Sequence, residues 1–129
     1  MKTVEIKVVV ASGMAKIDSV TGATPDDFGW RVLVKASASE TAVFRVLGAD
    51  TASHAAIVGV WSYSPPNDPN ATAVSLQREP ATGTLICFYT APLAHSADFR
   101  IEVETSTTPN PVPRGGGHFR VLDEGGGLP

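Results

Sequence analysis

The chain has 129 residues, with 10 Lys+Arg, 13 Asp+Glu and a single Cys. This length suits one domain whose core needs no metal or disulfide, and one Cys excludes both an intrachain disulfide and a Cys-rich zinc module. The net charge of −3 argues against a general nucleic-acid binder, and no apolar run is long enough for a membrane span.

The composition and the spacing of apolar residues predict an all-β fold. The chain contains 15 Val and 12 Thr, β-branched residues that suit a half-buried pleated surface. Apolar residues recur at every second position in several segments, and 12 Gly and 10 Pro fall largely between these segments. We therefore expect an antiparallel β-sandwich of about 7–9 strands, formed as a single domain by residues 1–122.

The N-terminal region is predicted as an extra strand, residues 2–11, followed by a long loop, residues 12–29. Val4, Ile6 and Val8 share one face of this strand, which could complete its own sandwich or pair with the edge of a neighbouring molecule. Charged residues within the strand interrupt the apolar run that a secretory signal needs. Loops as long as 12–29 are uncommon unless they are functional or mobile, although 14–17 could hide a short strand or turn.

Six or seven further strands follow in the chain. The clearest is Asp98–Glu104, in which Phe99, Ile101 and Val103 alternate with charged residues. The other segments with strand patterns are Trp30–Ala36, Thr41–Leu47, Ala56–Ser64, Thr72–Gln77, Thr84–Thr90 and Gly117–Leu122.

Proline and glycine mark the predicted connections. Pro65–Asn70 and Glu79–Gly83 read as loops, because proline lacks the N–H that a strand ladder needs. The segment from Pro109 to Gly117 is expected to be a stiff and then flexible connector, and residues 123–129 a flexible Gly-rich tail.

Two motifs in the second part of the chain resemble those of bacterial immunoglobulin-like (Big-type) domains. Val60-Trp61-Ser62-Tyr63-Ser64-Pro65 is similar to the W-S-x-S-P that ends one strand in that family. Tyr89-Thr90-Ala91-Pro92, followed by the alternating strand from Phe99, is similar to the family's Y-T-A-P turn and next strand. The resemblance covers residues 41–122 and implies an immunoglobulin-like sandwich that serves as a spacer, adhesin or decoration module, without shared catalytic residues.

Histidines and acidic residues give only weak candidates for a metal site. Asp50 and His54 could form one corner of a site, and Asp26-Asp27 or Asp123-Glu124 could offer oxygen ligands to calcium. No spacing supplies three or four ligands, so we expect His54, His95 and His118 to have surface or loop roles and the acidic pairs to be solvated. No cofactor is predicted.

The single cysteine is predicted to be structural. Cys87 lies within the apolar segment Leu85–Phe88 and is expected to be a small buried residue. His95 follows eight residues later, but nothing in the sequence brings it within reach as a base.

Aromatic residues raise the possibility of a sugar-binding surface. Trp61 and Tyr63 have the same parity as Ile57, so we expect them in the core. Trp30 opens its strand and is the predicted exposed contact residue for a ligand.

These observations favour a non-enzymatic structural or interaction module. We expect protein partners or self-association through strand edges or sheet faces, on a virion or a cell surface, with no nucleic acid bound. The alternative is a carbohydrate-binding accessory module. An enzyme with residues 12–29 as a lid is a third hypothesis, but no nucleophile–base pair or metal spacing supports it.

Overall fold

The computed structural model describes residues 2–12, 14–27, 29–63, 73–75, 83–90, 97–106 and 114–124. Their elements, in chain order, are β1 (Lys2–Ala11), β2 (Met14–Thr21), β3 (Thr24–Asp26), β4 (Gly29–Val34), the 3₁₀ helix η1 (Ala36–Ala38), β5 (Thr41–Gly48), α1 (Thr51–Ala56), β6 (Ile57–Tyr63), β7 (Ala73–Ser75), β8 (Leu85–Thr90), β9 (Ala97–Thr105) and β10 (Arg114–Asp123). The all-β prediction is confirmed.

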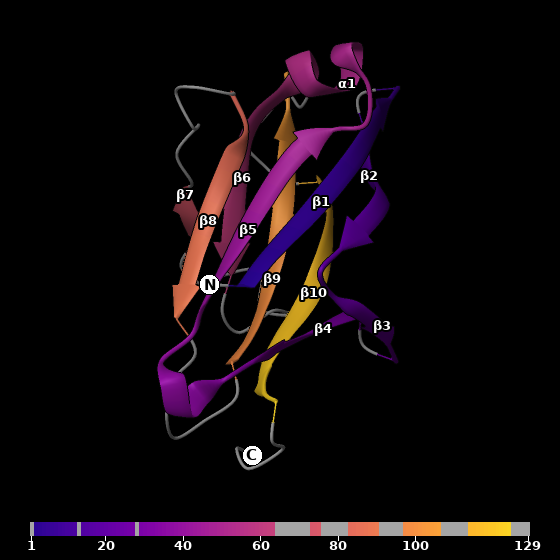
Figure 1. Ribbon diagram of the computed structural model, residues 1–129. Helices are drawn as coiled ribbons and strands as arrows, with labels where there is room; N and C mark the ends of the chain where they lie inside the picture. Colours follow the sequence, from indigo (N-terminus) through magenta and orange to yellow (C-terminus); the bar gives the residue numbers. More distant parts are fainter. Residues whose placement is uncertain are drawn as a thin grey trace.

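The strands form two sheets that pack together as a sandwich (Figure 1). The four-stranded sheet has the order β2-β1-β5-β8, and the six-stranded sheet has the order β3-β4-β10-β9-β6-β7. Both sheets are mixed, because β1 runs parallel to β5 and β4 runs parallel to β10. The expected sandwich, with mostly antiparallel pairs, therefore also contains two parallel pairs, each of which joins strands far apart in the sequence.

Alternating side chains from both sheets form one apolar core. Val4, Ile6 and Val8 of β1 are almost completely buried, as their period of two predicts. At the centre, Phe44 of β5 packs edge-on against Phe119 of β10, with ring centroids 5.4 Å apart. Ile101 and Val103 of β9 are buried as expected, whereas the side chain of Phe99 lies outside the described part of the structure.

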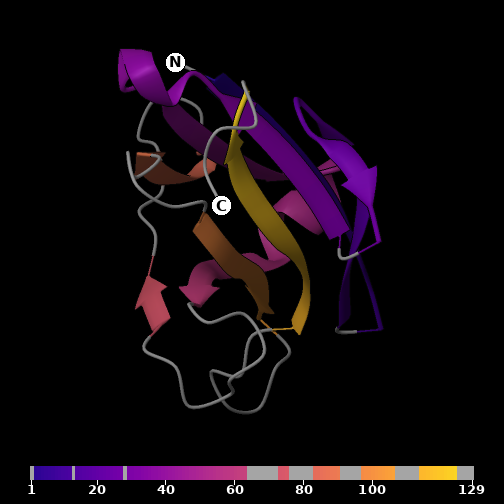
Figure 2. The ribbon, with the colours of Figure 1, turned by 90° about the horizontal axis from the view of Figure 1, so that it is seen from below.

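The long loop predicted at 12–29 is instead two strands. β2 forms an antiparallel hairpin with β1, and β3 pairs with β4 in the other sheet. β2 and β3 lie along the same side of the molecule in both views (Figures 1 and 2). The prediction failed because β2 is a bulged edge strand, in which Asp18 is skipped in the register with β1. Only Ala15 is buried, and the alternation of apolar residues is weak.

A short helix precedes β6, where the sequence pattern predicted strand from Ala56. Asp50 caps helix α1 by accepting a hydrogen bond from the Ser53 amide at 2.7 Å, and this bond lowers the pKa of the carboxyl group. The buried Ser53 hydroxyl in turn accepts a hydrogen bond from the Val10 amide. These contacts hold α1 against the end of β1.

The C-terminal strand extends beyond its predicted limits at both ends. Gly115–Gly117, expected in a flexible connector, belongs to β10, and Asp123, expected in the tail, is its last residue. The Asp123 carboxylate accepts a hydrogen bond from the Ala36 amide at 3.2 Å. Glycine is required at 117 for space, because an added Cβ would lie 2.7 Å from the Trp30 ring and 2.8 Å from Ile17.

Candidate functional site

The outward-facing side of the six-stranded sheet carries the main concentration of polar side chains in the described structure. We call it the charged face. It comprises Asp26, Arg31, Trp61, Asp98, Arg100, Glu102, Glu104, His118 and Arg120, contributed by five neighbouring strands. On β4 and β10 these residues alternate with buried Val32, Phe119 and Val121, so the same strands that build the core also display the charges.

Trp61 lies on the charged face and not in the core, contrary to the sequence prediction. The pairing of β6 with β9 has a register irregularity between Ile57 and Gly59, which reverses the parity of the residues that follow. Val60 therefore faces the core, and Trp61 faces outward, opposite Glu102. The half-buried Trp61 indole donates a hydrogen bond from Nε1 to Glu104 Oε2 at 2.9 Å. Tyr63 ends the same strand, but its side chain lies outside the described part of the structure.

Glu102 is a buried carboxylate on this otherwise accessible surface. Its residue is 8% exposed, and its carboxylate forms an ion pair with Arg100 on the same strand. A buried carboxylate is tolerated only when such a partner compensates for its lost hydration. The Arg100 side chain remains 43% exposed, so it can contact another molecule while holding Glu102.

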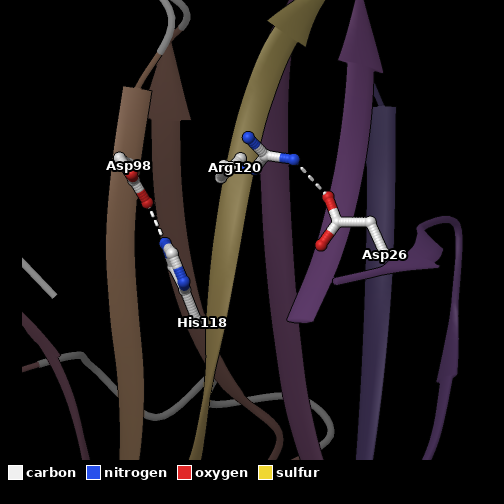
Figure 3. A network of polar contacts seen from close by, with 4 residues as sticks. All are labelled: Asp26, Asp98, His118 and Arg120. Atoms are coloured by element: carbon white, nitrogen blue, oxygen red, sulfur yellow. Dashed lines mark hydrogen bonds and ion pairs between the residues drawn. The ribbon is translucent and has the colours of Figure 1, made fainter. Parts of the chain in front are cut away.

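Two further contacts link different strands across the charged face (Figure 3). His118 of β10 contacts the carboxylate of Asp98 on β9. Arg120, two residues later, donates from Nη2 to Asp26 Oδ2 on β3 at 2.6 Å. Since Asp26 is only 12% exposed and β3 does not adjoin β10, this ion pair ties the edge of the sheet to its middle. Asp26, considered above as a calcium ligand, is thus occupied by a guanidinium.

Arg31 is the exception in this set of paired charges. It lies directly opposite Arg120 in the parallel β4–β10 register. Within the described ranges, no hydrogen bond or ion pair engages its guanidinium, and its Nε is buried without a hydrogen-bond partner. Arg120 Nε also lacks a hydrogen bond, but the Arg120 guanidinium is bound to Asp26 through Nη2. Two like charges therefore face each other across the strands, a pairing that ordinarily disfavours a sheet.

Trp30, the predicted contact residue, packs at the rim of the core. Its indole stacks on Phe119 with ring centroids 5.3 Å apart and an interplanar angle of 20°. It also approaches Ile17 and Gly117, and it is half-buried. Trp30 is thus on the inner side of β4, and the charged face lacks it. The charged face was not predicted from the sequence, because the residues that form this face come from five strands and share no local sequence motif.

His54 has both ring nitrogens engaged in the fold. Nδ1 accepts a hydrogen bond from the Gly48 amide at 3.0 Å, and Nε2 contacts the Gly83 carbonyl oxygen at 3.2 Å. The Asp50–His54 corner is not assembled, because Asp50 caps α1. His95 lies outside the described residues.

Cys87 is buried on the inner face of β8, as predicted. Burial raises the pKa of its thiol to about 11, because a thiolate would lose its hydration there. It is therefore a poor nucleophile at neutral pH.

The described residues contain no group of three or more His, Cys, Asp or Glu side chains that could hold a metal ion. Their helices are also too short to cross a membrane.

Comparison with known proteins gave no match: no family model, no curated protein and no solved structure is significantly similar to this chain.

Proposed function

We propose that this chain is a non-enzymatic structural or interaction module whose contacts with other protein subunits, copies of itself foremost, are made through the charged face. The observation that carries the proposal is the composition of this face: three arginines, a tryptophan and four carboxylates on one sheet surface. Arginine and tryptophan are enriched where proteins contact one another.

The distribution of charge favours a protein partner over a polyanion. Acidic and basic side chains are interspersed on this face and pair between strands, as in Asp98–His118 and Asp26–Arg120. A surface with both signs can meet a second copy of itself across a two-fold axis with opposite charges in contact. A nucleic acid would instead meet four carboxylates on this surface and a net charge of −3 on the chain.

The strand order supports an immunoglobulin-like module as the setting. In that fold, strands C, F and G lie in one sheet, and B and E lie in the other. Here β6, β9 and β10 are neighbours in the six-stranded sheet, and β5 pairs with β8 in the four-stranded sheet. The first two strands, β1 and β2, are additional to this arrangement. A module of this kind suits a virion or a cell surface, where such sandwiches serve as decoration or adhesion domains.

Light scattering on the purified chain tests the proposal. The weight-average mass should rise with protein concentration and rise less at high salt, because charge pairs are screened. Arg100→Glu, on the charged face, should return the mass to that of a single chain. Lys16→Glu makes the same charge change on the exposed edge of the other sheet and should not. A single-chain mass at every concentration would contradict self-association.

The second candidate function is carbohydrate binding, and Trp61 favours it. Its indole lies on an accessible sheet face beside Glu104 and Arg100, an arrangement in which a ring could stack on a sugar while polar groups bond its hydroxyls. Retention on polysaccharide columns should then be lost in Trp61→Ala and kept in Trp30→Phe, since Trp30 packs on Phe119. Absence of retention on every polysaccharide would rule this function out.

A further inference from the structure

One arginine of the charged face has no acidic partner in the described structure. Of the four carboxylates on the charged face, Asp26 pairs with Arg120, Asp98 with His118, Glu102 with Arg100, and Glu104 with the Trp61 indole. Each acidic group is therefore engaged within the chain. Arg31 alone among the arginines of this face has no such partner in the described structure.

The position of Arg31 in the sheet makes it favourable for its guanidinium to bind an anion. Arginine side chains carry a positive charge in proteins, and Arg31 lies directly opposite a second arginine, Arg120, in the sheet. The buried Nε of Arg31 lacks a hydrogen bond, so part of its hydration is lost without replacement. The Asp26 carboxylate is bound by Arg120 and not by Arg31 in the described structure, so one of the two positive charges stays without an acidic partner.

The surroundings of Arg31 indicate which anion fits. Leu33 follows it on the same face of β4, is 38% exposed, and pairs with Leu122 of β10. A guanidinium beside two leucine side chains fits a ligand that carries a carboxylate next to an apolar side chain. The overall negative charge of the chain disfavours a multiply charged ligand.

From this geometry we infer that Arg31, with Arg120 beside it, binds a single carboxylate presented by a partner protein subunit, and that Leu33 and Leu122 contact the adjoining apolar residue. The inference deepens the proposed function and rests on it, because it assigns a chemical group to the interaction surface. A carboxylate would accept two hydrogen bonds from the guanidinium nitrogens and neutralise the excess charge.

The test uses the full chain labelled with ¹⁵N and a capped glutamate–leucine dipeptide, with the capped glutamine–leucine dipeptide as its neutral match. The glutamate dipeptide should shift the Arg31 side-chain resonance and the backbone amides of Arg31 and Arg120, with millimolar affinity. Arg31→Gln should weaken binding about tenfold or more, and Lys16→Gln, on the other sheet, should leave it unchanged. Arg31→Lys keeps the charge without the planar fork and should fall between them.

Three outcomes would overturn the inference. One is the absence of shifts at Arg31, and another is equal shifts with the glutamine dipeptide. The third is tighter binding of inorganic sulfate or phosphate than of the glutamate dipeptide, which would assign the site to a tetrahedral oxyanion. If the dipeptide fails while Arg100→Glu still abolishes self-association, only the role of Arg31 is wrong. If the dipeptide binds a chain that never self-associates, the carboxylate site stands and the self-association proposal fails.

Discussion

The two faces of the six-stranded sheet contrast sharply, although the same strands form both. On β10, Phe119 and Val121 are completely buried. His118 and Arg120 alternate with them and contact Asp98 and Asp26 on the opposite face. The inner face is mainly apolar, with Thr105 of β9 as a buried polar residue, and its burial accounts for much of the folding free energy. The outer face holds charges, most of them in pairs, and the more exposed of these pairs contribute little to stability. Along a single strand, the residues that bury apolar surface therefore alternate with the residues that carry charge.

Removing a central aromatic ring should have the largest effect. Phe119 is completely buried and contacts both Phe44 and Trp30, so Phe119→Ala leaves a cavity between the sheets. The free energy of unfolding should fall by about 3–5 kcal/mol, as measured by chemical denaturation. A loss below about 1 kcal/mol would show that the core does not depend on this contact.

Raising the pH tests whether the inner face of the other sheet also excludes charge. The pKa of the Cys87 thiol is raised from 9.0 to about 11, so the folded protein retains a proton that the unfolded chain has released. The contribution of the neutral thiol is therefore complete below pH 9 and is lost as the pH rises toward 11.

This loss should amount to about 2–3 kcal/mol, measured as the difference in unfolding free energy between the two pH values. Cys87→Ala is the control: its own stability should vary less over the same range. Parallel pH profiles for the two proteins would contradict the burial of the thiol.

Neutralising Asp26 should have an intermediate effect. In Asp26→Asn the partly buried guanidinium of Arg120 loses its charged partner, and unfolding should become easier by about 1–2 kcal/mol. Asp98→Asn is the matched change on the same face, where the carboxylate is 51% exposed, and it should cost less than about 1 kcal/mol. Equal losses would mean that burial does not distinguish the two ion pairs.

Removing the charge of Arg31 should have the smallest effect on stability. No intramolecular ion pair is lost in Arg31→Gln, and repulsion from Arg120 is relieved, so the unfolding free energy should stay the same or rise by up to about 0.5 kcal/mol. Thermal unfolding measures this. A clear destabilisation would show that Arg31 supports the fold and is not reserved for a partner.

The sequence predicted the fold class well because the inner face of each long strand leaves a local pattern. Val4, Ile6 and Val8 alternate with polar residues, and their burial could be anticipated from neighbours alone. β2 was missed because an edge strand buries little on either side. The parallel pairing of β1 with β5 is set by contacts distant in sequence, which periodicity does not report.

The candidate site was much harder to predict than the fold. The charged residues were visible, but the pairing of Asp26 with Arg120 spans 94 positions. The prediction that Trp61 faces the core applied the strand period of two correctly. The bulge after Ile57, however, reverses which side of the sheet the following residues face. A single extra residue in a strand is a tertiary feature without a sequence signal of its own, and here it determines which side of the sheet bears the indole.

The place of β10 in its sheet has a consequence for how the protein is made. This strand lies between β4 and β9, and it alone connects the β3–β4 pair to the β9–β6–β7 group. During synthesis both groups emerge from the ribosome before the strand that unites them. The two groups can therefore be joined into one sheet, and the charged face completed, only after β10 has been synthesised.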